Sequence, residues 1–108
     1  MNVKGPIACV ITLTFGFVAL FAADEDKHNY KPRTGYVPDA ATAIKIAIAV
    51  WEPIYGAAHI AGERPYHALL RDEIWTVEGS LPKNTLGGVA VAEISKDDGR
   101  ILRVSHGK

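Results

Sequence analysis

The sequence has few of the residues on which most enzyme mechanisms depend. Its 108 residues include one cysteine, Cys9, which lies within an apolar N-terminal run. The patterns G-x-S-x-G, H-E-x-x-H and a glycine-rich loop ending in Lys-Ser or Lys-Thr are all absent. These absences weigh against most familiar mechanisms of hydrolysis and phosphoryl transfer, and no cofactor is expected.

The sequence also has no excess of positive or negative charge. Lys and Arg number 12, Asp and Glu number 12, and the formal net charge is zero. Such a chain has no long-range field that would draw it to nucleic acid or to anionic lipid. A partner must therefore be recognised through local contacts.

An apolar run long enough to cross a bilayer is missing too. One lysine precedes the run that contains ITLTFGFVALF, and Ala22 and Ala23 stand before the charged stretch DEDKH. The run is shorter than the roughly 18 to 20 apolar residues that a spanning helix needs, and no basic stop-transfer cluster follows it. Residues 1–22 are therefore expected to be a signal peptide, with an uncleaved anchor as the alternative.

Cleavage would remove Cys9 and leave about 86 residues in the periplasm or outside a bacterial cell. Residues 24–38, DEDKHNYKPRTGYVP, contain two prolines and show no helix or strand period. We therefore expect a flexible segment over residues 23–37 and a single domain over residues 38–108.

The stretch from Asp39 through AATAIKIAIAVW predicts one long helix, with Asp39 capping its first amide groups. One apolar stripe contains Ile44, Ile48, Trp51 and Tyr55, and a second contains Ile46 and Val50. Two stripes indicate burial on most sides. We therefore expect a curved sheet to wrap the helix, with alanines 40, 41, 43, 47 and 49 allowing the strands to approach closely.

The sequence WEPIYG marks the end of this helix. Pro53 lacks the amide that would bond the carbonyl of Ala49, so the helix is expected to kink or stop there. Gly56 permits a left-handed conformation that closes helix ends. Trp51 and Tyr55, which flank the break, are expected to anchor it in the core.

Alternating patterns then predict four antiparallel strands, at residues 66–71, 74–79, 89–95 and 100–106. Asp72 and Glu73 would form the first turn, and Gly99 would supply the positive φ of the last one. The predicted fold class is α+β, with one long N-terminal helix packed on a curled antiparallel sheet of four strands.

Histidines and carboxylates are the remaining candidates for chemistry. The histidines, His28, His59, His67 and His106, are separated by eight or more residues, so no local metal-ligand geometry follows and no metal is expected.

Asp72 and Glu73 belong to a solvated turn. Glu78 and Glu93 lie within strands, and either would be a candidate acid if its face of the sheet were buried.

The segments AVWEPIYG, RPYHALLRDEIWTVEGSLP and GGVAVAEISKDDGRILRVSHGK together resemble the immunity proteins of nuclear transport factor 2-like fold in bacterial polymorphic toxin systems. The resemblance extends from Gly35 to Lys108. The matched positions are Trp51, Pro53, Ile54, Tyr55, Gly56, Pro65, Tyr66, Ile74, Trp75, Gly79, Leu81, Pro82, Gly87, Gly88, Asp98, Gly99, Ser105, His106 and Gly107.

This resemblance implies a cystatin-like sheet curled round a helix, no catalysis, and binding to a cognate toxin so that its active site is blocked. The chain is shorter than a complete domain of that fold, so the deep pocket of the fold is not expected. Polar loop residues are the predicted partner contacts: Glu63, Arg64, Lys83 and Asn84, together with His106 from the cationic C-terminal strand.

Two other functions fit the same residues. One is a periplasmic small-ligand binder or enzyme with Glu78 or Glu93 inside an enclosed cavity. The other is a cystatin-like inhibitor of hydrolases, because VAVAEISKDDGRILRV is a strand, turn and strand of the kind found in such domains. A homodimer is a further possibility, with Trp51 and Trp75 at its interface.

Overall fold

The computed structural model describes residues 28–107. The chain divides into two units, Met1–Lys31 and Pro32–Lys108, and of the first only residues 28–31 are described. The expected signal peptide lies outside the described residues. No helix among the described residues combines the length and apolar character that crossing a membrane requires.

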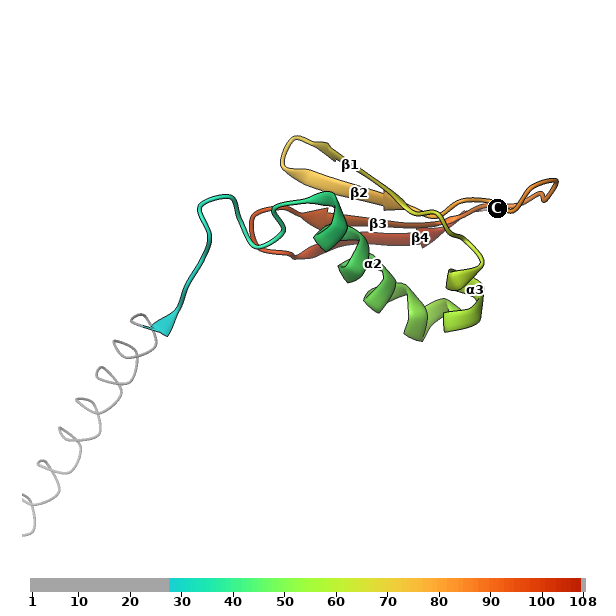
Figure 1. Cartoon of the computed structure of the whole chain (residues 1–108), viewed down its shortest axis with the longest axis horizontal. Coiled ribbons are helices and arrows are strands. Elements are labelled where there is room, and N and C mark those ends of the chain that lie inside the picture. The colour runs from blue at the N-terminus through green and yellow to red at the C-terminus, as the bar shows by residue number, and fades with distance from the viewer. Residues whose placement is uncertain (1–27, 108) are drawn as a thin grey trace, which may run out of the picture. The chain divides into compact units, whose positions relative to one another are not determined.

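The second unit contains two helices followed by four strands (Figure 1). The helices are α2 (Ala40–Tyr55) and α3 (Ala57–Ala61). The strands are β1 (His67–Arg71), β2 (Ile74–Glu78), β3 (Ala90–Ser95) and β4 (Ile101–His106). Each strand pairs antiparallel with its neighbour in sequence, which gives the sheet order β1-β2-β3-β4. The predicted α+β fold class is confirmed.

Turn residues set the register of the outer strand pairs. Asp72 and Glu73 have φ of 53° and 62° in the two-residue turn between β1 and β2, the conformation of a type I′ hairpin. Gly99 has φ of 76° in the turn before β4, as predicted. A register shift between Glu93 and Ile94 in the β3–β4 pairing adds local twist, which suits a curled sheet.

Helix α2 lies against one face of the sheet, and α3 lies on the same side (Figure 1). Ala43, Ala47 and Trp51 have no exposed surface, and they pack with Trp75, Val77, Ala90, Ala92 and Ile94 from the strands. Small residues at two successive turns let the helix approach β2 and β3 closely, as the alanine pattern predicted.

The prediction that the sheet would enclose most sides of the helix is wrong. Ala41, Lys45, Ala49 and Glu52 are exposed, and Ile46 and Val50 are only partly buried. Strands of five or six residues form a sheet too small to wrap a helix of 16 residues. The helix therefore buries a single face.

A kink or a stop was expected at Pro53, and the stop is wrong, because α2 continues through this proline to Tyr55. Pro53 and Ala49 are both exposed, so the Ala49 carbonyl that loses its amide donor lies on the side that water can reach. Gly56 has φ of 97° and ψ of 137°, so its φ is positive as expected, but ψ falls outside the left-handed helical region. Gly56 redirects the chain into α3 instead of closing a left-handed cap.

The C-terminal end of the segment that precedes α2 packs against the rest of the domain. The amides of Tyr36 and Val37 donate to the carbonyls of Asp97 and Lys96, at 2.9 and 3.0 Å, and Val37 is fully buried. The indole N–H of Trp75 donates to the Val37 carbonyl at 2.8 Å. Tyr36 and Val37, at the end of the segment 23–37 that was expected to be flexible, are therefore attached to the domain.

Replacing the Trp75 indole tests this contact. We expect Trp75→Phe to lower the free energy of unfolding by about 1–3 kcal/mol, because the buried Val37 carbonyl loses its donor. Urea denaturation measures the change. Trp51→Phe is the matched control, since its indole bond to the Val91 carbonyl is longer, 3.3 Å, and only partly buried. A larger loss in the control than in Trp75→Phe would contradict the assignment.

The N-cap of α2 predicts a pH dependence. Hydrogen bonds from the Thr42 hydroxyl and amide, at 2.7 and 2.8 Å, lower the pKa of the Asp39 carboxyl below 3.8. Because the pKa of Asp39 is lower in the folded state, the capping hydrogen bonds contribute their full stability at pH values above the pKa of the unfolded state. This contribution is lost as the pH falls through the pKa of the folded state. Asparagine also caps helices but has no carboxyl group to protonate. Asp39→Asn should therefore lose less thermal stability than the wild type when unfolding is measured from about pH 7 to about pH 3.

Candidate functional site

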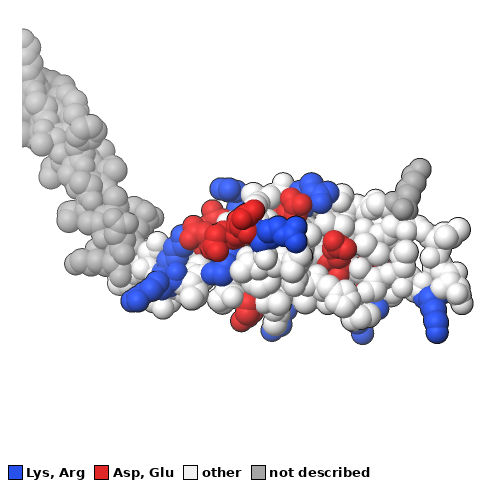
Figure 2. Space-filling model, turned by 90° about the horizontal axis from the view of Figure 1, so that it is seen from above, with Lys and Arg blue, Asp and Glu red and all other residues white. Residues whose placement is uncertain are grey.

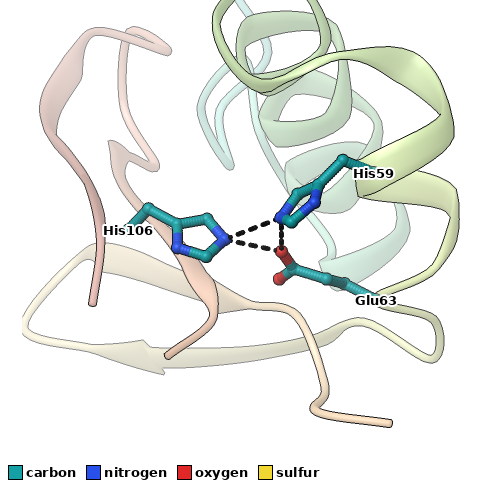
Figure 3. Close-up of side chains that lie close together, drawn as sticks. All are labelled: His59, Glu63 and His106. Carbon is teal, nitrogen blue, oxygen red and sulfur yellow. Dashed lines mark hydrogen bonds and ion pairs between the residues drawn. The ribbon is translucent and has the colours of Figure 1, made fainter. Parts of the chain in front are cut away.

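Three side chains from separate parts of the chain meet at one end of the sheet (Figure 3). His59 comes from α3, Glu63 from the segment after α3, and His106 is the last residue of β4. The Nε2 atom of His106 lies 2.8 Å from Oε2 of Glu63 and 3.1 Å from Nε2 of His59. The third side of the triangle, from His59 Nε2 to Glu63 Oε2, is 3.1 Å.

Glu63 is the buried member of this cluster, with 5% of its surface exposed. Its backbone continues the last turn of α3, since its amide donates to the Ile60 carbonyl at 3.0 Å. Its own carbonyl accepts from the Ser80 amide at 2.7 Å, and Oε1 accepts from the Ala90 amide at 2.8 Å. The prediction that Glu63 is an exposed loop residue is wrong, because its carboxylate connects α3 to the start of β3.

Gly79 provides the space for this carboxylate. A Cβ atom at Gly79 would lie 2.8 Å from the Cβ of Glu63 and closer still to its carboxylate. Real Cβ atoms do not approach so closely, and Glu63 is held from both its backbone and its side chain. The glycine matched by the sequence resemblance is therefore required here by a close approach.

Both ring nitrogens of His106 have an oxygen neighbour. Nε2 lies 2.8 Å from Oε2 of Glu63, where an imidazole N–H would donate to the carboxylate. Nδ1 lies 3.2 Å from the carbonyl oxygen of Gly107, which can only accept. A neutral imidazole can donate to one of these two oxygens, and the contact with Glu63 is the shorter.

An open pocket of about 530 Å³ borders the cluster. Besides the three cluster residues, its walls include Ala58, Gly62, Leu81, Pro82, Thr85 and Leu86. The ring of Tyr55 packs against His106 with a centroid distance of 5.0 Å, which supports that imidazole from the helix side. The pocket thus has a polar floor and a largely apolar wall formed by the loop between β2 and β3.

The other predicted partner contacts are exposed but do not join the cluster. Arg64 follows Glu63 and has an exposed side chain, while Lys83 and Asn84 lie in the loop between β2 and β3. Whether they contact a partner stays a prediction.

The two candidate acids lie on the sheet face away from α2. Glu78 is exposed, and Glu93 pairs with Arg103 at 3.1 Å. Neither carboxylate therefore lies in an enclosed cavity. The hypothesis of a small-ligand binder or enzyme is left without its candidate acid residue.

Trp51 and Trp75 have 0% and 7% of their surface exposed, so they are core residues. They are therefore not the dimer-interface residues of the homodimer hypothesis.

Two of the histidines lie in contact, although their sequence spacing indicated no local ligand geometry. His59 and His106 are 47 residues apart in the sequence, and pairing of Ala90 with His106 in the β3–β4 register brings them together. The spacing of His59 and Glu63 by four residues was the one local signal, because residues four apart share a helix face.

The helix packed on a curled four-stranded antiparallel sheet is consistent with the class of nuclear transport factor 2-like folds. A sequence model described as NTF2 fold immunity protein matches residues 42–108, and the chain belongs to this family. The family expected from the sequence is thereby confirmed. Membership of an immunity protein family points to a non-enzymatic role.

Two Escherichia coli (strain K12) proteins are similar to the chain, and both are named as uncharacterized. YhhH is 37% identical over 85 residues, which is 78% of this chain and 66% of YhhH. YbbC is 33% identical over 84 residues, which is 77% of this chain and 66% of YbbC. The chain thus spans just under two thirds of the length of these relatives. No solved structure matches it significantly.

Substituting Gly79 tests whether the glycine makes room for Glu63. We expect Gly79→Ala to lower the free energy of unfolding by about 1–3 kcal/mol, because Glu63 must shift and lose its bond to Ala90. Gly107→Ala is the matched control at the same pocket, since its Cβ would have no neighbour closer than 4.0 Å. Urea denaturation of both variants gives the comparison, and equal stabilities would refute the packing argument.

Proposed function

We propose that the protein is an exported immunity protein of a polymorphic toxin system that binds a cognate toxin and blocks its active site, without catalysis of its own. The observation that carries this proposal is the match of residues 42–108 to the NTF2 fold immunity protein family. The match includes the whole sheet, α3 and the pocket.

The loop between β2 and β3 supports a binding surface at the pocket. Leu86 is 97% exposed and Leu81 is 43% exposed, and both line the pocket wall. Exposed apolar side chains that border a concave surface are typical of contacts with another protein. Within residues 79–89 Lys83 is the only charged residue.

Charges elsewhere are mixed. Figure 2 shows interleaved red and blue groups on the face viewed, with a mostly uncharged end where the β2–β3 loop projects (Figure 1). A surface of this kind selects its partner by shape and apolar contact, because it has no dominant field for steering. This agrees with a dedicated partner better than with a nucleic acid.

Export fits the same proposal. The N-terminal pattern of one lysine, an apolar run and small residues predicts a signal peptide, which would deliver the protein to the periplasm. A toxin that acts on the cell envelope would be met there. The pocket wall, and not the sheet face that carries Glu93 and Arg103, is the surface that we assign to this toxin.

A pair of leucine variants tests both the function and the surface. The full chain is co-expressed with the toxin encoded beside its gene, and survival and binding are measured. We expect protection by the wild type and at least a tenfold weaker binding for Leu86→Asp, because a charge would replace a central apolar contact.

Leu69→Asp is the matched control, since Leu69 is 58% exposed and its partner in β2 is Thr76, away from the core. Failure of the wild type to bind or protect would reject the immunity function. Loss of protection in Leu69→Asp alone would place the toxin on the opposite face of the sheet.

A further inference from the structure

We propose that His59, Glu63 and His106 bind a divalent transition metal ion of the zinc class at the floor of the pocket. The three residues supply two imidazole Nε2 atoms and one carboxylate Oε2, and these atoms form a triangle with sides of 2.8, 3.1 and 3.1 Å (Figure 3). This goes beyond the toxin-binding function and departs from the expectation, drawn from sequence spacing, of no metal.

The size of the triangle suits a tetrahedral site. Zinc bonds of about 2.0–2.1 Å at tetrahedral angles separate ligand atoms by about 3.3 Å. The two sides that involve His59, at 3.1 Å, fall short of this value by about 0.2 Å, which a small rotation of the exposed His59 ring would supply. The side between His106 and Glu63, at 2.8 Å, falls short by about 0.5 Å, and those two side chains would have to move apart to admit the ion.

Two of the three ligands are already oriented by other groups. The Gly107 carbonyl holds Nδ1 of His106, and the Ala90 amide holds Oε1 of Glu63 at 2.8 Å. Metal-binding histidines commonly donate their other ring N–H to a carbonyl, and ligating carboxylates are themselves hydrogen-bonded. Glu63 therefore offers Oε2 in a fixed position from a buried site.

The donor set also limits the class of metal. Two imidazoles with one carboxylate suit Zn²⁺, Co²⁺, Ni²⁺ or Cu²⁺, whereas Ca²⁺ and Mg²⁺ prefer sites built from oxygen. Three protein ligands leave a fourth position, and the pocket that the cluster borders would give water access to it.

The test is metal titration of the full chain, purified without a histidine tag and stripped with a chelator. We expect isothermal titration with ZnCl₂ to give one site per chain, with a dissociation constant of about a micromolar or tighter. CoCl₂ should produce the intense visible absorption of a four-coordinate ion. Affinity should fall as the pH is lowered, because protons compete with the ion for the imidazole nitrogens.

Variants distinguish this site from adventitious binding. His59→Ala should retain the fold, since its side chain is 55% exposed, and should weaken zinc binding at least tenfold. Glu63→Gln, which keeps an acceptor for the Ala90 amide, should weaken it similarly. His67→Ala removes an exposed histidine outside the cluster and should leave the affinity unchanged.

Equal affinity of wild type and His59→Ala, or no saturable binding by the folded wild type, would overturn the proposal.

Discussion

Burial of the Glu63 carboxylate determines how the two ends of the domain meet. A carboxylate with 5% of its surface exposed is stable only when donors or cations surround it. Here the donors come from the amide of Ala90 on one oxygen and from the histidine side on the other. The exit from α3, the start of β3 and the end of β4 are therefore joined through one side chain.

This contact explains why the neighbouring backbone is so constrained. Gly79 must lack a side chain, because the Glu63 side chain occupies that position. Ser80 donates its amide to the Glu63 carbonyl, and its hydroxyl donates to the Pro65 carbonyl at 2.6 Å. Together these bonds set where the β2–β3 loop leaves the sheet, and so where the apolar wall of the pocket stands.

Sequence reasoning succeeded where the determining interactions are local. All four strands were predicted to within one residue at each end, because alternation and turn residues such as Gly99 are short-range signals. The Asp39 cap was likewise readable from the chain. The continuation of α2 through Pro53 was not, since it depends on the exposed position of the Ala49 carbonyl in the folded domain.

The cluster of His59, Glu63 and His106 could not be predicted from local sequence signals. Bringing His106 to Glu63 requires the register of β3 with β4 and the placement of α3 on the sheet, and neither is encoded in residue spacing alone. A polar residue after a short helix is by pattern a surface residue, and its burial follows only from Gly79 and Ala90 lying beside it.

The floor and the wall of the pocket differ in polarity and in how firmly their side chains are held. Its floor is held by bonds to Ala90 and Gly107 before any partner arrives, so binding there costs little ordering of side chains. Its wall carries Leu86, which is almost fully exposed and whose apolar surface a partner must cover to gain free energy. In the proposed complex, the fixed polar floor would select the partner by chemistry, whereas the exposed apolar wall would supply most of the affinity. Specificity and strength of binding would then depend on different residues of one pocket.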